Sequence, residues 1–212
     1  MTETIEITHD GITLPITYNS EGIIAEVKKT GNKFFEIQML SAIAKLPYRR
    51  GICMDIGANT GNHTVFFSRF CNFDEVWSYE PVKQSFDILK QNVKENCTRT
   101  VRLFNCAVGD KKGKVNISVD EENPSRSVVS RGRGATTILP ITTTVTVRLM
   151  KIDVEGYEKK VLKGAFNVID RDKPELFIET HGDPNELLPL LPKGYSIIKR
   201  YNNAPTYHLT AK

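Results

Sequence analysis

Long apolar runs and a charged leader are both missing from this sequence. The longest apolar stretches, "GICMDIGA" and "PELFIE", are far shorter than the ~20 residues that a transmembrane helix needs. The N-terminal residues "MTETIEITHD" are polar and acidic, unlike a signal peptide. We therefore expect a soluble, cytoplasmic protein that does not bind membranes.

The sequence also contains few cysteines and has a small net charge. The four cysteines among 212 residues share no CxxC or similar metal-ligand spacing, so we expect reduced thiols in the core. A formal net charge of +4 is too small to indicate a nucleic-acid partner. A hydrophobic content of 40% suffices for the core of one α/β domain, and a second full domain is not expected.

Strand and helix patterns alternate along most of the chain. Residues 1–47 predict an extension, with β-type alternation and turns to about residue 29 and a helix over about 33–46. Residues 48–212 predict the main domain, with strand patterns at 51–57, 75–80, 101–108, 114–119, 145–154, 175–180, 194–200 and 206–211. Residues 120–140 lack periodicity and predict a surface loop or mobile lid, or equally a disordered insert. This order predicts a doubly wound, mostly parallel α/β sheet with an antiparallel C-terminal edge strand, which would bind its ligand at the carboxyl ends of the parallel strands.

One glycine-rich segment, "MDIGANTGNHTVFFSR" at 54–69, lies where such a sheet binds its ligand. A dinucleotide-binding loop reads GxGxxG, because its middle glycine lets the backbone approach a pyrophosphate. Here that glycine is missing, and Asp55 precedes Gly57, where a carboxylate would repel phosphate but could accept hydrogen bonds from an ammonium. Glu80 follows 25 positions later, where a carboxylate can bind both ribose hydroxyls. An amino acid joined to a nucleoside indicates S-adenosylmethionine; the alternative is a tight turn in which Asp55 caps the helix.

Four segments in this order resemble the FkbM family of S-adenosylmethionine-dependent methyltransferases: "MDIGANTGNHTVFFSR", "VWSYEPVKQSFDILKQNV", "LFNCAVGD" and "LMKIDVEGYEKKVLKGA". The resemblance covers about residues 50–180 and implies a class I methyltransferase (Rossmann-like) fold that methylates a hydroxyl of a sugar, polyketide or similar small molecule. Relatives commonly have a longer stretch with a Leu-Asp pair before the last motif, so we expect the acceptor side of this chain to differ. The resemblance assigns the methionine part to the glycine loop, the ribose to Glu80 and the adenine side to Asn105 and Ala107. Together with the strand-end position of Asp153, the expected cofactor-binding residues are Asp55, Gly57, Ala58, Asn59, Gly61, Thr64, Glu80, Pro81, Asn105, Ala107 and Asp153.

Two pairs of titratable side chains follow two strand patterns: Asp153 with Glu155, and Glu179 with His181. Residues two apart point to one side of an extended strand, so neighbouring strands would bring all four to one rim. His181 is the preferred general base for the acceptor hydroxyl, because histidine titrates near neutrality, and Asp153 is expected to contact the cofactor or the acceptor. In the alternative, Asp153 and Glu155 cap the next helix, Glu179 pairs with Lys151, and His181 is simply exposed.

These residues define the expected chemistry. The four groups have the oxygen-rich character that Mg²⁺ or Mn²⁺ prefers, but their spacing does not require a metal and none is predicted. The Asn/Asp-Pro-Pro-aromatic motif of methyltransferases that act on base or amide nitrogens is replaced by "DVEGYE", which disfavours nucleic acid. The sequence favours O-methylation of a carbohydrate or secondary-metabolite-like acceptor, with S-adenosylhomocysteine as product. An NAD(P)-dependent oxidoreductase or epimerase, and an inactive cofactor-binding module, are the alternatives.

Overall fold

A seven-stranded sheet forms the centre of the computed structural model, which describes residues 2–47, 50–118, 127–131 and 134–212. The strand order is β12-β13-β11-β10-β3-β4-β5, and β11, β10, β3, β4 and β5 are parallel. The doubly wound, mostly parallel α/β fold is therefore confirmed. β13 is antiparallel to both neighbours, so the antiparallel C-terminal strand lies one position inside the edge, which β12 forms. The strands are β3 (Ile52–Ile56), β4 (Glu75–Tyr79), β5 (Thr100–Phe104), β10 (Val147–Ile152), β11 (Glu175–Glu179), β12 (Tyr195–Tyr201) and β13 (Thr206–Ala211).

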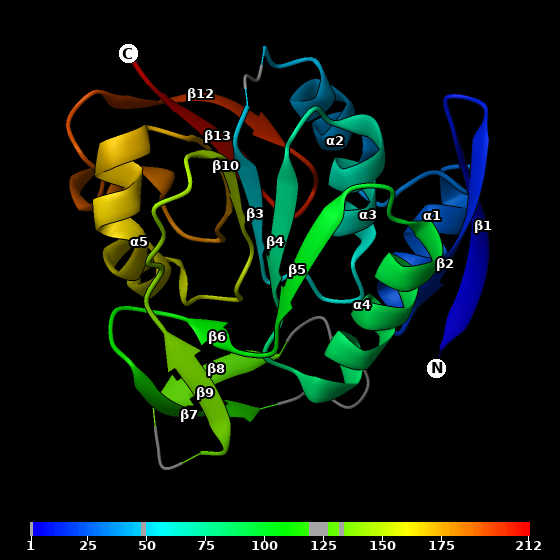
Figure 1. Ribbon diagram of the computed structural model, residues 1–212, viewed down its shortest axis with the longest axis horizontal. Helices are drawn as coiled ribbons and strands as arrows, with labels where there is room; N and C mark the ends of the chain where they lie inside the picture. The colour runs from blue at the N-terminus through cyan, green and yellow to red at the C-terminus, as the bar shows by residue number, and fades with distance from the viewer. Residues whose placement is uncertain (1, 48–49, 119–126, 132–133) are drawn as a thin grey trace.

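Helices cover both faces of this sheet (Figure 1). Helix α5 (Glu158–Asp172) lies on one side, while α2 (Ile37–Ala44), α3 (Asn62–Phe70) and α4 (Lys83–Asn96) lie on the other. Two short 3-10 helices, η2 (Pro184–Glu186) and η3 (Leu188–Leu190), connect β11 to the C-terminal hairpin. Because α3, α4 and α5 connect parallel strands, the carboxyl ends of the central strands lie together at one edge of the sheet.

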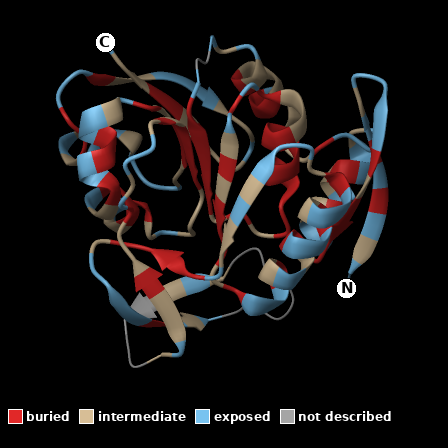
Figure 2. Ribbon diagram, in the orientation of Figure 1, coloured by how far each residue is buried: buried red, intermediate tan, exposed pale blue. Residues whose placement is uncertain are grey.

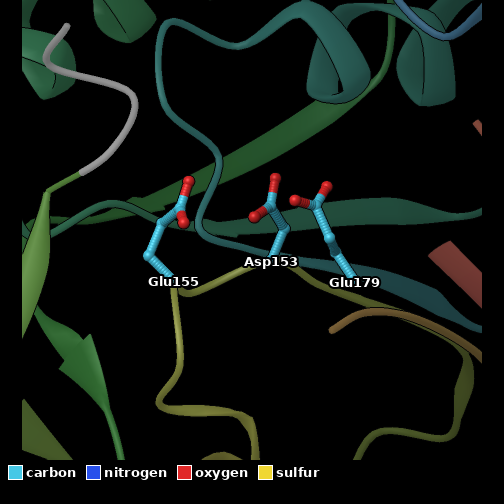
Figure 3. Close-up of side chains that lie close together, drawn as sticks. All are labelled: Asp153, Glu155 and Glu179. Carbon is cyan, nitrogen blue, oxygen red and sulfur yellow. The ribbon is translucent and has the colours of Figure 1, made fainter. Parts of the chain in front are cut away.

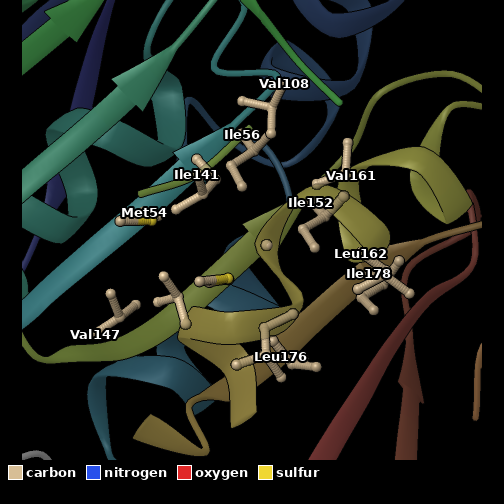
Figure 4. Close-up of a cluster of buried hydrophobic side chains, with 14 of the residues drawn as sticks. Met54, Ile56, Val108, Ile141, Val147, Ile152, Val161, Leu162, Leu176 and Ile178 are labelled. Carbon is tan, nitrogen blue, oxygen red and sulfur yellow. The ribbon is translucent and has the colours of Figure 1, made fainter. Parts of the chain in front are cut away.

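The central strands are buried on both faces, which explains their continuous apolar sequences (Figure 2). Met54, Ile56 and Ile152 pack with Val161 and Leu162 of α5 on one face (Figure 4). The opposite face packs against α3 and against the N-terminal extension, which includes α2, in a second continuous core. The extension thus shares its core with the sheet.

The N-terminal extension contains a helix that the strand-like pattern to residue 29 did not predict. A hairpin of β1 (Glu3–His9) and β2 (Ile12–Tyr18) is followed by α1 (Glu21–Lys29). The Ser20 side chain caps α1 by accepting a hydrogen bond from the backbone N–H of Ile23. Lys28 and Lys29 lie in the last turn, where their positive charges interact favourably with the helix dipole. The expectation of hairpins up to residue 29 was wrong over 21–29, because the cap at Ser20 and the two lysines at the other end stabilise a helix more than the short apolar–polar alternation favours a strand.

A second, four-stranded sheet replaces much of the expected loop at 120–140. Its order is β6-β9-β7-β8, formed by β6 (Ala107–Val108), β7 (Gly113–Ser118), β8 (Val128–Arg131) and β9 (Thr136–Leu139). The pattern over 101–108, expected as one strand, divides between β5 and β6 because a turn at Cys106 sends the chain into this sheet. The loop or disordered insert was wrong for β8 and β9, whose four-residue lengths are too short for periodicity to reveal. Residues 120–126 and 132–133 of that stretch lie outside the described residues, as does residue 119 just before it.

Within the described ranges, no helix is long and apolar enough to cross a membrane. All four cysteines are free, and Cys53, Cys71 and Cys106 are buried, as expected for reduced core thiols.

Close packing at Gly164 joins α5 to the small sheet. A Cβ at this position would lie 2.0 Å from the carbonyl oxygen of Gly109, just after β6. The carbonyl of Gly164 also accepts from the N–H of Ile141, 3.1 Å away, beyond β9. The contact holds the small sheet beside the carboxyl ends of the central strands.

Replacing Gly164 by alanine should therefore destabilise the protein by about 1–3 kcal/mol, the usual cost of overpacking. Gly22→Ala is the matched control, because Gly22 is also helical but its Cβ would meet only the Ser20 hydroxyl at 3.9 Å. That control should be neutral or stabilising by at most ~1 kcal/mol through helix propensity. Urea unfolding measures both variants, and a Gly164→Ala protein as stable as the wild type would contradict the packing described here.

Candidate active site

The glycine loop after β3 is held tightly against the neighbouring strands. Gly57 has a φ of +81°, and a Cβ there would lie 1.7 Å from the carbonyl oxygen of Asp153. Only glycine fits this position. The N–H groups of Gly57 and Ala58 both donate to the carbonyl of Tyr79 at 3.0 Å, which ties the loop to the end of β4.

Asp55 lies beneath this loop and is fully buried. Its Oδ2 accepts a hydrogen bond from the Thr64 hydroxyl at 2.6 Å, and Thr64 Oγ1 also lies 2.8 Å from Ser78 Oγ. Its Oδ1 lies 3.6 Å from the Nζ atom of Lys151. The ammonium that Asp55 faces in this structure therefore belongs to the chain itself.

Lys151 is a buried cation between two strand ends. Its side chain is 3% exposed, and its Nζ donates to the Gly57 carbonyl and to Asp153 Oδ2, both at 3.2 Å. Burial alone lowers the pKa of Lys151, but the charges of Asp153 and Asp55 outweigh burial and raise it above its usual value. The ammonium stays charged and balances its acidic neighbours.

Glu80 supplies a buried carboxylate at the end of β4. Its Oε2 accepts from the N–H of Asn59 at 2.8 Å, and its Oε1 accepts from the N–H of Val82 at 2.7 Å. Burial raises the pKa of Glu80 to about 7, although these two hydrogen bonds counteract the shift. Asn105 donates to the Glu80 carbonyl at 2.8 Å and so fixes the same turn from β5.

Three carboxylates gather at the ends of β10 and β11. Asp153, Glu155 and Glu179 each place an oxygen within 4.8 Å of the others, and Figure 3 shows the three groups directed to one side. Burial raises the pKa of Glu179 to about 8, with further contributions from the charges of Asp153 and Glu36. Glu179 therefore retains a proton at neutral pH. The three carboxylates are also close enough to one another to share a small cation.

His181 stands at the outer side of this carboxylate cluster. Its Nε2 lies 3.6 Å from Glu179 Oε1, and its side chain is 67% exposed, compared with 13% for Glu179. The four expected catalytic groups therefore do meet on one rim, but the imidazole faces solvent while Glu179 lies inside.

A cavity of about 700 Å³ connects these features. It extends from the glycine loop and the end of β4, past the start of β6, to the carboxylate rim and the N-terminal extension. Its lining includes all four expected catalytic residues and, of the expected cofactor-binding residues, Gly57, Asn59, Glu80, Pro81, Ala107 and Asp153. The others, Asp55, Ala58, Gly61, Thr64 and Asn105, are not lining residues, and the contacts above place Asp55, Thr64 and Asn105 as supports of the cradle.

Glu36 is a lining residue that sequence reasoning missed. Its side chain is 5% exposed, lies 3.0 Å from His63 Nε2, and accepts a hydrogen bond from Asn202 Nδ2 at 2.7 Å. One carboxylate thus joins the extension, α3 and the C-terminal hairpin. Its neighbours are 27 and 166 positions away, so no local pattern could reveal it. Lys151, by contrast, did leave a signal: it is a charged residue near the end of a strand that, apart from Arg148, is apolar.

The cavity fits the cofactor that the sequence resemblance implies. Its volume lies within the usual range for small-molecule sites, and it presents a carboxylate for a ribose at Glu80 and another for an ammonium at Asp153. Asn59 Oδ1 is buried without a hydrogen-bond partner among the described residues, as expected for an atom that bonds a ligand. Asn59 and Glu155 also adopt left-handed backbone conformations, with a φ of 49° each, a strain that often marks functional sites.

Comparisons with known proteins bear on the family of the chain. The sequence profile described as the methyltransferase FkbM domain matches residues 55–203. The hexuronic acid methyltransferase AglP of Haloferax volcanii is 26% identical over 150 residues, which are 66% of this chain and 61% of AglP, so the chain spans less than two thirds of that relative.

Two solved structures share the fold. Methyltransferase FkbM from Methylobacillus flagellatus KT has a TM-score of 0.53 at 20% identity, over 78% of this chain and 45% of that one. M. jannaschii TYW2, crystallised with AdoMet, has a TM-score of 0.50 at 13% identity, over 99% of this chain and 87% of that one. Because the profile covers well over half of the sequence, the chain belongs to the methyltransferase FkbM domain family.

Proposed function

We propose that this protein transfers a methyl group from S-adenosylmethionine to a hydroxyl of an uncharged or amino-bearing carbohydrate, or of a similar polyol. The observation that carries the proposal is the carboxylate cluster of Asp153, Glu155 and Glu179 in the same cavity as the glycine loop and Glu80. Membership of the FkbM family supports the reaction, and the name of AglP, a hexuronic acid methyltransferase, supports a carbohydrate acceptor. That named acceptor is anionic, and the acidic lining described below is the reason to expect an uncharged or amino-bearing sugar here instead.

The cavity divides into a cofactor side and an acceptor side. On the cofactor side, Glu80 would accept the ribose hydroxyls, Asp153 the methionine ammonium, and the backbone near Ala107 would contact the adenine. S-adenosylmethionine supplies a methyl group activated by its attachment to a sulfonium sulfur. On the acceptor side, Phe35 and Glu36 of the extension line the same cavity as the carboxylate rim.

Glu179 is the group best placed to remove the acceptor proton. It lies inside the rim, and its raised pKa matches a base that works near neutral pH. With S-adenosylmethionine bound, the acceptor hydroxyl would give its proton to Glu179 as it takes the methyl group, and S-adenosylhomocysteine would leave. His181, 3.6 Å away and exposed, would carry that proton onward to solvent. This assignment gives His181 a relay role in place of the general-base role that the sequence favoured.

The charge of the lining indicates which acceptors can enter. Among the described residues that line the cavity, the acidic side chains are Glu26, Glu36, Glu80, Asp153, Glu155 and Glu179, and His181 is the one group that can become positive. An anionic sugar would approach like charges, and this juxtaposition is unfavourable. A neutral or ammonium-bearing sugar meets no such repulsion.

Removing the base should lower turnover strongly. Glu179→Gln should reduce kcat/KM by roughly 100-fold or more, the usual contribution of a general base, whereas His181→Asn should reduce it by about 10-fold or less. In the wild type, kcat/KM should rise with pH and level off above about 8, because the ionised form of Glu179 accepts the proton. Methyl transfer from labelled S-adenosylmethionine across pH 6–9 measures all three profiles.

Two results would contradict this mechanism. If His181→Asn removed the pH dependence while Glu179→Gln kept its activity, histidine would be the base. If activity disappeared in EDTA and returned with Mg²⁺, the cluster would hold a cation rather than a proton.

Acceptor charge should control the rate. Uronic acids should be methylated at least ~10-fold less efficiently than their uncharged amides, a difference of about 1.4 kcal/mol, and amino sugars should be accepted. The amide is the matched control because it keeps the hydroxyls and removes the charge. Mass spectrometry of the methylated products gives kcat/KM for each pair, and a preference for the uronate would contradict the proposed acceptor class.

A further inference from the structure

We propose that Lys151 is a positioning residue for the amino-acid end of S-adenosylmethionine. Its ammonium fixes the two protein groups that face that end, the Gly57 carbonyl and the Asp153 carboxylate. The inference rests on the proposed cofactor but adds a residue that does not line the cavity and acts only through others.

Strand register places Lys151 for this role. In the parallel pair of β10 and β3, Lys151 lies directly opposite Asp55. Its side chain extends to the carboxyl ends of both strands and contacts Gly57 from β3 and Asp153 from β10. One ammonium therefore sets the position of the glycine loop relative to the catalytic rim.

Charge balance explains why a cation is needed there. Asp55 Oδ1 is buried and accepts no hydrogen bond within the described part of the chain, so its ion pair with Lys151 is its compensation. Asp153 is 27% exposed and also pairs with Lys151. Without that ammonium, two carboxylates at adjacent strand ends would repel each other, and removing one partner of a buried pair is strongly unfavourable.

The adenosine end does not depend on Lys151 in the same way. Both oxygens of Glu80 accept from backbone N–H groups, those of Asn59 and Val82, and the segment after β4 is further held by Asn105. Loss of Lys151 should therefore weaken contacts to the methionine moiety more than contacts to the nucleoside. A merely structural role would weaken both ends alike.

Calorimetric titration can separate these two roles. The ligands are S-adenosylhomocysteine, which has the amino-acid end, and 5′-methylthioadenosine, which lacks it. Methionine is close to lysine in shape but uncharged. Lys151→Met should raise the Kd for S-adenosylhomocysteine by about 30-fold or more and the Kd for methylthioadenosine by less than about 3-fold. Lys160→Met is the matched control, because Lys160 pairs with Asp110 at 2.9 Å, away from the cavity lining, and should change neither affinity.

A second variant keeps the test informative if Lys151→Met does not fold. Asp55→Asn/Lys151→Met also removes the buried charge that would lose its partner. It should show the same selective loss, because the Gly57 carbonyl and the Asp153 carboxylate still lose the ammonium that they share. Equal losses for both ligands, or no loss for either, in a variant that melts like the wild type would overturn the positioning role. Failure of the wild type to bind S-adenosylhomocysteine would instead overturn the proposed cofactor itself, and the inference with it.

Discussion

The site depends on one electrostatic constraint: several carboxylates share a buried edge of a sheet with the ammonium of Lys151. Asp55 and Asp153 end neighbouring strands, Glu80 and Glu179 end the strands on either side, and Lys151 lies between the first two. Parallel topology forces this crowding, because it brings all the carboxyl ends of the strands to one edge. The fold tolerates the charges because Lys151 compensates two of them, backbone N–H groups compensate Glu80, and a retained proton compensates Glu179.

This arrangement lowers stability in favour of function. The ordinary pKa of Glu179 is 4.5, and burial raises it to about 8 in the folded protein. Between these two pH values the unfolded chain releases a proton that the folded protein keeps, so the contribution of Glu179 to stability is present below about pH 4.5 and is lost as the pH rises to about 8. A ligand that brings positive charge to the cavity, as a sulfonium and an ammonium do, would offset that loss.

Much of the fold and part of the site could be predicted from the sequence. Buried parallel strands produce continuous apolar runs, so the ends of β3, β4, β10 and β11 could be located, and with them Gly57, Glu80, Asp153 and Glu179. Sequence reasoning failed where the determinant was not local. Helix α1 depends on the cap at Ser20, β8 and β9 depend on pairing with β7, and Glu36 acquires its neighbours only through tertiary packing. Asp55 was placed correctly at the end of a strand, but its ammonium partner within the chain could be seen only from the register of β10 against β3.

We expect one cavity to hold the cofactor with its sulfur toward the carboxylate cluster. A crystal structure of the protein with S-adenosylhomocysteine would show whether it does. The ribose hydroxyls should lie on Glu80, the homocysteine ammonium on Asp153, and the sulfur should face Glu179. A nucleoside bound outside this cavity, or a sulfur turned away from Asp153, Glu155 and Glu179, would contradict it.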